Sequence, residues 1–199
     1  MKIARRVLAL AFASFIVFVA GCDGFDFDPE PPFIPSPPPQ FKPLSEKENL
    51  VFNLVLSYNR ADITHYEELL HPDYTWYFQS ADQARGLPVF WTREQDLNAT
   101  KNMFLGARGQ YADTAMFLDK LSLDITSGSW VPIDSIGGAP CNDCWMTARQ
   151  YSLTCMLSGG SDGFAGYDLV QIIVMPVGDG AQKVYKIRRM QDIRIAGPD

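Results

Sequence analysis

A change in the spacing of the hydrophobic residues constrains the fold of this chain more than any other feature of its sequence. Up to about residue 104, apolar residues recur mainly every three or four positions, which is typical of amphipathic helices. From about residue 114 to residue 195 they largely alternate with polar residues, which is typical of half-buried strands. The pattern predicts an α+β domain in which most helices precede the sheet.

Two helices are predicted from capping boxes, in which a hydroxyl residue and an acid or amide three positions later satisfy the first backbone N–H groups. Ser45 and Glu48 form one such pair before a helix that runs to Asn59. Thr92 and Gln95 form the other, before a helix that ends near residue 104. These pairs predict where the first and third helices begin.

The second helix is predicted to be short, because Asp62 can cap its start and Pro72 stops it. The period then changes to two residues, which places Tyr74, Trp76 and Phe78 on one face of a strand. This strand precedes the third helix.

Four further strands are predicted after the third helix, separated by glycine-rich or proline-rich turns. They cover residues 114–125, 145–157, 167–175 and 183–195. Consecutive strands joined by short loops favour an antiparallel meander.

This order of elements resembles the nuclear transport factor 2-like superfamily. Residues 59–63 and 69–76 resemble its helix, turn and first strand, and residues 185–192 resemble its closing strand. The resemblance covers a domain at residues 44–196. It implies three N-terminal helices packed on a curved, mainly antiparallel sheet that forms a cone with a cavity.

Enzymes of this superfamily, such as steroid isomerases and polyketide cyclases, place an acid or a histidine in the cone. The isomerase pattern would put its general base at Phe78 and its hydrogen-bonding tyrosine at Leu54. Neither side chain can transfer a proton. The resemblance therefore argues against isomerase chemistry of this kind.

A ligand pocket is predicted from the last strand. If its odd positions face the cone throughout, polar groups enter an aromatic-walled cavity. The predicted lining residues are Tyr58, Trp76, Phe78, Tyr151, Arg189 and Gln191. In the other interpretation, a bulge near Met190 switches the apolar face and leaves Arg188 or Arg189 in solvent or paired with an acid.

The two histidines, His65 and His71, have the ordinary pKa best suited to proton transfer at neutral pH. Both lie at the ends of the predicted second helix, where structural roles are expected. If the protein is an enzyme, the candidate catalytic residues are His71, Asp73 and Arg189. No metal or cofactor motif is found in the sequence, so neither is expected.

The cysteines after the leader are Cys141, Cys144 and Cys155. A structural disulfide between Cys141 and Cys144 is favoured, with redox chemistry or free thiols as the alternatives. Two cysteines are too few for a zinc site. Cys155 is expected to be a buried free thiol.

The N-terminus has the layout of a secretory signal, with Lys2, Arg5 and Arg6 before an apolar run at residues 7–20. The sequence Val-Ala-Gly-Cys that ends at Cys22 resembles the bacterial lipoprotein signal. It implies removal of residues 1–21 and acylation of Cys22, which would anchor the protein stably in a membrane. The alternative is an ordinary cleaved signal. Asp23 weakly favours the periplasmic face of the inner membrane.

Residues 22–43 are predicted to form an acidic, proline-rich, disordered tether, with eight of the chain's 14 prolines. A docking site for an aromatic-lined groove is the alternative. Loss of three basic leader residues leaves 14 basic against 23 acidic residues, a net charge of −9. Nucleic acid is therefore not expected as a partner.

These features predict an envelope lipoprotein with a non-catalytic domain that binds a small apolar ligand, an envelope protein or a second copy of itself. The alternative is an isomerase, dehydratase or cyclase that acts on a small apolar hydroxy or keto compound.

Overall fold

A computed structural model describes residues 37–106, 118–157 and 163–193 of the chain. The leader, Cys22 and most of the tether lie outside these residues, and the folded unit begins at Pro39. Its elements are α2 (Lys47–Asn59), α3 (Ile63–Leu69), β1 (Leu70–Tyr77), α4 (Ser80–Gln83), β2 (Phe90–Thr92), α5 (Arg93–Phe104), β3 (Leu118–Ile125), β4 (Val131–Ile136), β5 (Ala139–Leu157), β6 (Gly163–Val177), a 3-10 turn (Gly180–Gln182) and β7 (Val184–Ile193).

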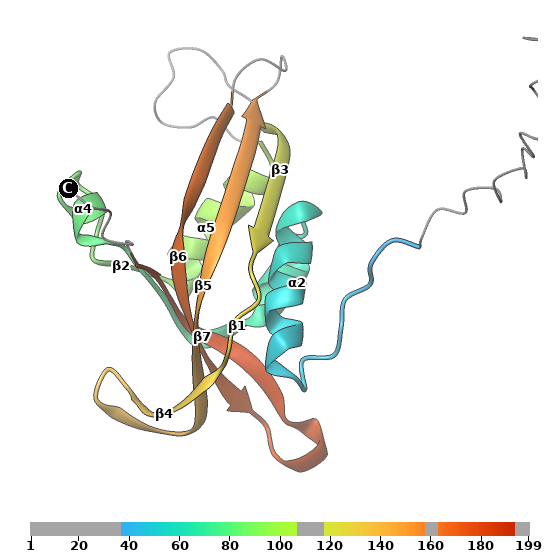
Figure 1. The fold of residues 1–199 in the computed structure, drawn as a ribbon, viewed down its shortest axis with the longest axis vertical. Helices are drawn as coiled ribbons and strands as arrows, with labels where there is room; N and C mark the ends of the chain where they lie inside the picture. Colours follow the sequence, from blue (N-terminus) through green and yellow to red (C-terminus); the bar gives the residue numbers. More distant parts are fainter. Residues whose placement is uncertain (1–36, 107–117, 158–162, 194–199) are drawn as a thin grey trace, which may run out of the picture. The chain divides into compact units, whose positions relative to one another are not determined.

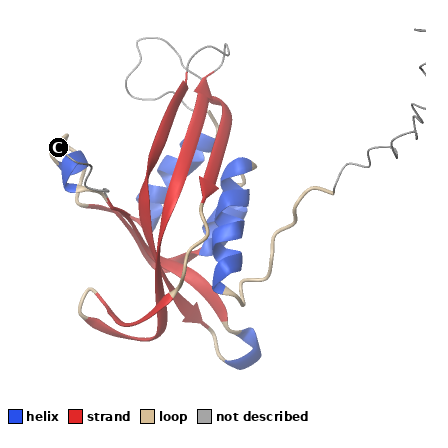
Figure 2. Ribbon diagram, in the orientation of Figure 1, coloured by secondary structure: helices blue, strands red, loops and turns tan. Residues whose placement is uncertain are grey.

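Seven of these elements form one sheet in the order β2-β1-β7-β6-β5-β3, and β4 pairs with the first part of β5 (Figure 1). All the pairs are antiparallel except β1 with β7, which is parallel. Helices α2 and α5 run alongside the long strands (Figure 2). The predicted α+β class, with helices on a curved, mainly antiparallel sheet, is confirmed.

The core lies where α2 and α3 meet the strands. Helix α2 presents apolar residues at helical spacing, and these are buried because they pack against β3 and β7. The most deeply buried apolar side chains of the core are Leu50, Leu54, Tyr66, Leu69, Tyr74, Val170, Ile172, Val174 and Ile187. Core packing therefore fixes the helices over the sheet.

The predicted capping box of the third helix is confirmed, since Thr92 Oγ1 accepts from the Gln95 N–H and the Gln95 side chain accepts from the Thr92 N–H. The predicted box at the first helix is wrong. Helix α2 begins at Lys47, and its N-cap residue, Glu46, makes no side-chain cap. The Glu48 carboxylate binds the guanidinium of Arg149 instead.

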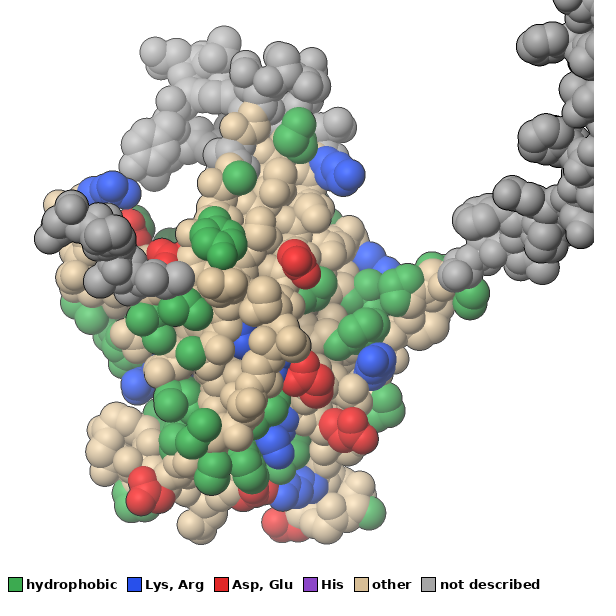
Figure 3. Space-filling model, in the orientation of Figure 1, with side chains coloured by type: hydrophobic (Ala, Val, Ile, Leu, Met, Phe, Trp, Pro, Cys, Tyr) green, Lys and Arg blue, Asp and Glu red, His purple; other side chains and the backbone are tan. Residues whose placement is uncertain are grey.

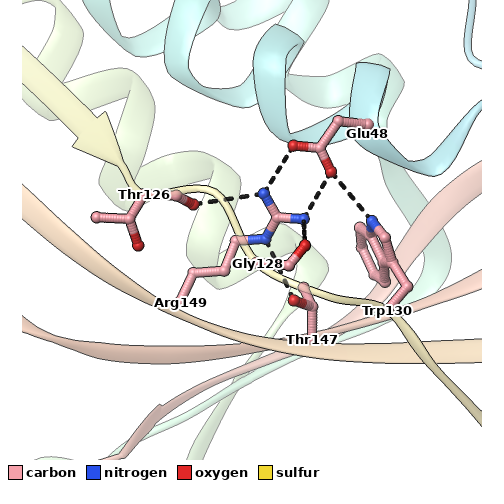
Figure 4. Close-up of polar contacts among 6 residues, drawn as sticks. All are labelled: Glu48, Thr126, Gly128, Trp130, Thr147 and Arg149. Atoms are coloured by element: carbon pink, nitrogen blue, oxygen red, sulfur yellow. Dashed lines mark hydrogen bonds and ion pairs between the residues drawn. The ribbon is translucent and has the colours of Figure 1, made fainter.

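Arg149 lies at the centre of a buried polar cluster that joins α2 to β5 (Figure 4). Its Nη1 and Nη2 donate to the two oxygens of Glu48 over 2.8 and 2.6 Å. Its other N–H groups donate to Thr147 Oγ1 and to the carbonyl oxygens of Thr126 and Gly128. Only 1 % of the Arg149 side chain is exposed, so a charge removed from water is fully hydrogen-bonded here.

A hairpin between β4 and β5 was not predicted from the sequence. Gly137 and Gly138 form its turn, with φ values of 60° and 83° that favour glycine, and Ile136 pairs with Ala139 across it. Helix α4 and strand β2 were also missed, because each is too short to show a hydrophobic period.

Strand β7 contains a bulge at Arg188. Ile187 pairs with Val174 of β6, but Arg189 pairs with Ile173, so β7 has one extra residue between these pairs. The extra residue reverses which positions face the core: Tyr185 and Ile187 are buried before it, and Met190 after it. Of the two interpretations of this strand, the switch of the apolar face near Met190 is the one that the structure shows.

On the face drawn in Figure 3, acidic and basic side chains lie interspersed among hydrophobic ones. Within the described residues, no helix is both long enough and apolar enough to cross a bilayer.

Candidate functional site

A cavity of about 390 Å3 lies between the sheet and helices α2, α4 and α5. Its volume falls in the range of small-molecule sites. Aromatic side chains form much of its wall: Tyr58, Trp76, Phe78, Trp91 and Tyr151. Most of the remaining wall is aliphatic, from β3, β5, β6 and α5.

The aromatic wall is held by ring-to-ring packing. Trp91 of β2 meets Phe78 edge to face, with ring centroids 4.7 Å apart, and Phe78 contacts Trp76 at 6.5 Å. Such pairs contribute about 0.5–1.5 kcal/mol beyond the area they bury. Four residues predicted from the sequence, Tyr58, Trp76, Phe78 and Tyr151, thus line the cavity.

Arg189 and Gln191 do not line the cavity in the described part of the chain, so their predicted place is corrected. The bulge at Arg188 turns these odd positions to the other side of the sheet. There the Arg189 guanidinium lies 4.6 Å from the centre of the Tyr77 ring, in a cation–π contact.

His71 and Asp73, the other two catalytic candidates, also lie outside the cavity lining. The Asp73 backbone N–H donates to His71 Nδ1 over 3.0 Å, which closes a local turn at the start of β1. Burial lowers the pKa of His71, and the nearby Arg188 and Lys186 lower it further, against the opposing effect of Asp73. His71 thus makes a local contact with the backbone and does not line the cavity.

Asp192 is a cavity residue that sequence reasoning missed. The Tyr151 hydroxyl, on the neighbouring wall, donates to its Oδ1 over 3.2 Å. Burial is the main cause that raises the pKa of Asp192 to about 6, against the opposing effect of the hydrogen bond from Tyr151. The charges of Asp168 and Asp82 add to the rise. Asp192 faces inward because the bulge brings even positions of β7 to the cavity.

Asp96 of α5 is the second missed carboxyl. Only 4 % of the residue is exposed, and the Tyr66 hydroxyl donates to its Oδ2 over 2.6 Å. Burial raises the pKa of Asp96 to about 6, although the hydrogen bond from Tyr66 opposes that change. Asp96, Thr100 and Met103 all line the cavity at helical spacing. The spacing groups them on one face of the helix but does not show that this face lines a cavity.

Both carboxyls can exchange a proton near neutral pH, because their raised pKa values lie close to it. Each also has one carboxylate oxygen that accepts no hydrogen bond from the described residues. The cavity thus offers apolar walls with three aspartates, Asp82, Asp96 and Asp192, of which the last two can bind or protonate a guest.

No cysteine lines this cavity in the part of the chain that the structure describes. Cys141 and Cys144 are paired as a disulfide in the structure, with Cα atoms 5.9 Å apart, and Cys155 is free and buried. Burial raises the pKa of the Cys155 thiol to about 11, which disfavours the reactive thiolate. Among the described residues, no group of three or more His, Cys, Asp or Glu side chains could hold a metal ion.

No protein-family model and no curated protein sequence matches this chain. Among solved structures, it is similar to an NTF2-like protein of unknown function in nutrient uptake from Rhodospirillum rubrum ATCC 11170. The two are 13 % identical over 76 % of this chain and 99 % of the other, with a TM-score of 0.50. The Kfla4162 protein of Kribbella flavida is 12 % identical over 73 % and 85 % of the two chains, also with a TM-score of 0.50. These similarities show the fold.

Proposed function

From the nuclear transport factor 2-like fold of this chain, we propose that it is a bacterial envelope lipoprotein whose domain binds a small, largely apolar molecule. The cavity carries this proposal. It combines a volume of about 390 Å3, mostly apolar walls and three lining carboxyls, which is the usual composition of a ligand site. A protein partner or a second copy of the chain remains the alternative occupant of the domain's surface.

The binding step can be tested with 2-(2-naphthyl)ethanol, a neutral probe small enough for the cavity. Trp76 and Trp91 line the wall, so we expect binding to change the tryptophan fluorescence. Ala99→Phe should abolish the change, because Ala99 lines the cavity and the added ring would fill it. Asn98→Phe is the matched control, since Asn98 is exposed on the same helix. Equal responses from both variants would contradict binding in the cavity.

The anchor is proposed from the sequence pattern around Cys22. Two or three acyl chains on this residue would hold the domain at a membrane through the proline-rich tether, and Asp23 favours the inner membrane. We expect the protein extracted in detergent to carry the mass of the acyl chains and to lack residues 1–21. Cys22→Ser should remove the acyl mass and release the protein from the membrane fraction. A wild-type protein without acyl mass in native mass spectrometry would disprove the anchor.

A second candidate function, catalysis on an apolar hydroxy or keto compound, is favoured by Asp192. Its hydrogen bond with Tyr151 and its pKa of about 6 suit a general acid or base. The two functions differ in which small molecule stays bound after purification. If the protein is an enzyme, the Asp192→Asn variant should retain its unconverted substrate after purification, and the wild type should not. If the protein is a binding domain, the variant should retain no compound that the wild type lacks.

A further inference from the structure

The ionisable groups that line the cavity are all acids or phenols. Asp82, Asp96 and Asp192 contribute carboxyls, and Tyr58 and Tyr151 contribute hydroxyls. No lysine, arginine or histidine lines the cavity within the described residues. The lining formed by the described residues therefore carries a charge that is negative or zero at any pH.

Further acidic charge lies just behind this wall. Asp168 of β6 accepts a hydrogen bond from the Gln79 side chain over 2.7 Å, and its charge acts on both Asp192 and Tyr151. Asp82 has a cationic neighbour, Arg85, at 3.6 Å, but 81 % of the Arg85 side chain is exposed. An exposed pair of this kind is screened by water and offsets little of the negative charge.

An apolar guest alone would leave this charge uncompensated. Asp96 is buried and Asp192 is half-buried. Once they ionise above pH 6, each carboxylate has a single hydroxyl donor from the described residues, Tyr66 and Tyr151 respectively. Buried charges are normally paired, because an unpaired one is strongly destabilised. A positive group in the cavity would supply the missing partner for both.

The aromatic wall favours the same kind of guest. The faces of Trp, Tyr and Phe rings attract cations, with about 0.5–2 kcal/mol for each favourable contact. Five such rings surround the cavity, two of them indoles. Aromatic rings and carboxylates together are the chemistry that recognises an ammonium group.

We propose that the ligand of this cavity is an organic cation, an alkylated or protonated amine carried on an apolar body. This inference rests on the proposed binding function and narrows it. The ammonium group would lie near Asp192 or Asp96, and the apolar body would contact the aliphatic wall that includes Leu123 and Val170.

The test compares three probes with the same ring: 2-(2-naphthyl)ethylamine, 2-(2-naphthyl)ethanol and 2-naphthylacetate. At pH 7.5 and 150 mM salt, the amine is expected to bind about tenfold more tightly than the alcohol, and the carboxylate least tightly. Isothermal calorimetry measures all three dissociation constants. Most of the preference for the amine should be lost at pH 4.5, where the amine is still charged but Asp96 and Asp192 are protonated.

Two sets of titratable groups surround the carboxyls that are expected to cause this pH dependence. Asp192 is faced by Tyr151 of β5, Asp168 of β6 and Asp82 of α4. Asp96 is faced by Tyr66 of α3, Tyr58 of α2 and Tyr74 of β1. The tyrosines stay neutral between pH 4.5 and 7.5, so the carboxyls account for the change.

Two variants distinguish binding of the amine in the cavity from its attraction to the acidic surface of the protein. Asp192→Asn should lose most of the tenfold preference while keeping its affinity for the alcohol. Asp124→Asn removes the same charge from an exposed position of β3 and should leave the preference unchanged. Alcohol binding as tight as amine binding would overturn the cation inference and leave the binding function standing. If neither probe binds, the binding function itself fails.

Discussion

Replacing Arg149 with alanine is expected to lower the free energy of unfolding by about 2–3 kcal/mol, because oxygen acceptors lose a buried charged donor, whereas the remaining Glu48, 57 % exposed, can be solvated by water. The Arg149 side chain is 1 % exposed and bridges Glu48 at the start of α2 to the segment between β3 and β4. Its removal leaves three oxygen acceptors without this donor, whereas the Glu48 carboxylate keeps a hydrogen bond from the Trp130 indole N–H. Denaturant unfolding monitored by circular dichroism measures the change.

Arg85→Ala is the matched control for this prediction. Arg85 also pairs with an aspartate, Asp82 at 3.6 Å, but its side chain is 81 % exposed. We expect a change below about 1 kcal/mol, because water screens an exposed pair. Similar losses in the two variants would show that burial does not determine the strength of the Arg149 cluster. The proposed contribution of the Arg149 cluster to the free energy of unfolding would then be refuted.

Asp96→Asn is expected to stabilise the protein at pH 8 by up to about 3 kcal/mol. The pKa of Asp96 rises from an ordinary 3.8 to about 6 on folding, and each unit corresponds to about 1.4 kcal/mol. Because the raised pKa means that folding favours the protonated carboxyl, the stability that Asp96 contributes to the wild-type fold is fully present below about pH 4. It is lost as the pH rises through 6. Asparagine is neutral at every pH and can still accept the hydrogen bond from Tyr66.

The advantage of Asp96→Asn over the wild type should therefore shrink as the pH falls from 8 to 4.5. Chemical denaturation at pH 4.5, 6 and 8 measures it, and Asp192→Asn should behave similarly because its carboxyl has the same raised pKa of about 6. Asp124→Asn, on the exposed side of β3, should show no such trend. A constant difference at all three pH values would mean that Asp96 ionises normally in the folded protein.

If these variants are more stable than the wild type, the two carboxyls lower the stability of the domain at neutral pH. Groups that destabilise a fold in this way are typical of functional sites, where activity opposes stability. This result would support a role for Asp96 and Asp192 in the cavity, whether they bind a cation or transfer a proton.

The aromatic part of the cavity could be predicted from the sequence, but its acidic part could not. Trp76 and Phe78 alternate along one strand, and that local alternation is enough to place them on one face. Asp96 was not identified because an acid in the first turn of a helix is usually explained by the helix dipole. Only the packing of α5 against β1 and β3 shows that this carboxyl is buried.

The sequence by itself determined the α+β class, the three main helices and the long strands, because hydrophobic period and capping residues act within a few positions of the chain. The tertiary structure decided which polar groups face the cavity. One extra residue at Arg188 exchanges the two faces of β7, so Asp192 faces inward and Arg189 outward. That bulge is set by pairing with β6 across the sheet. Likewise, Glu48 bonds Arg149 rather than capping α2 because a buried guanidinium, 101 residues away in the chain, requires its charge.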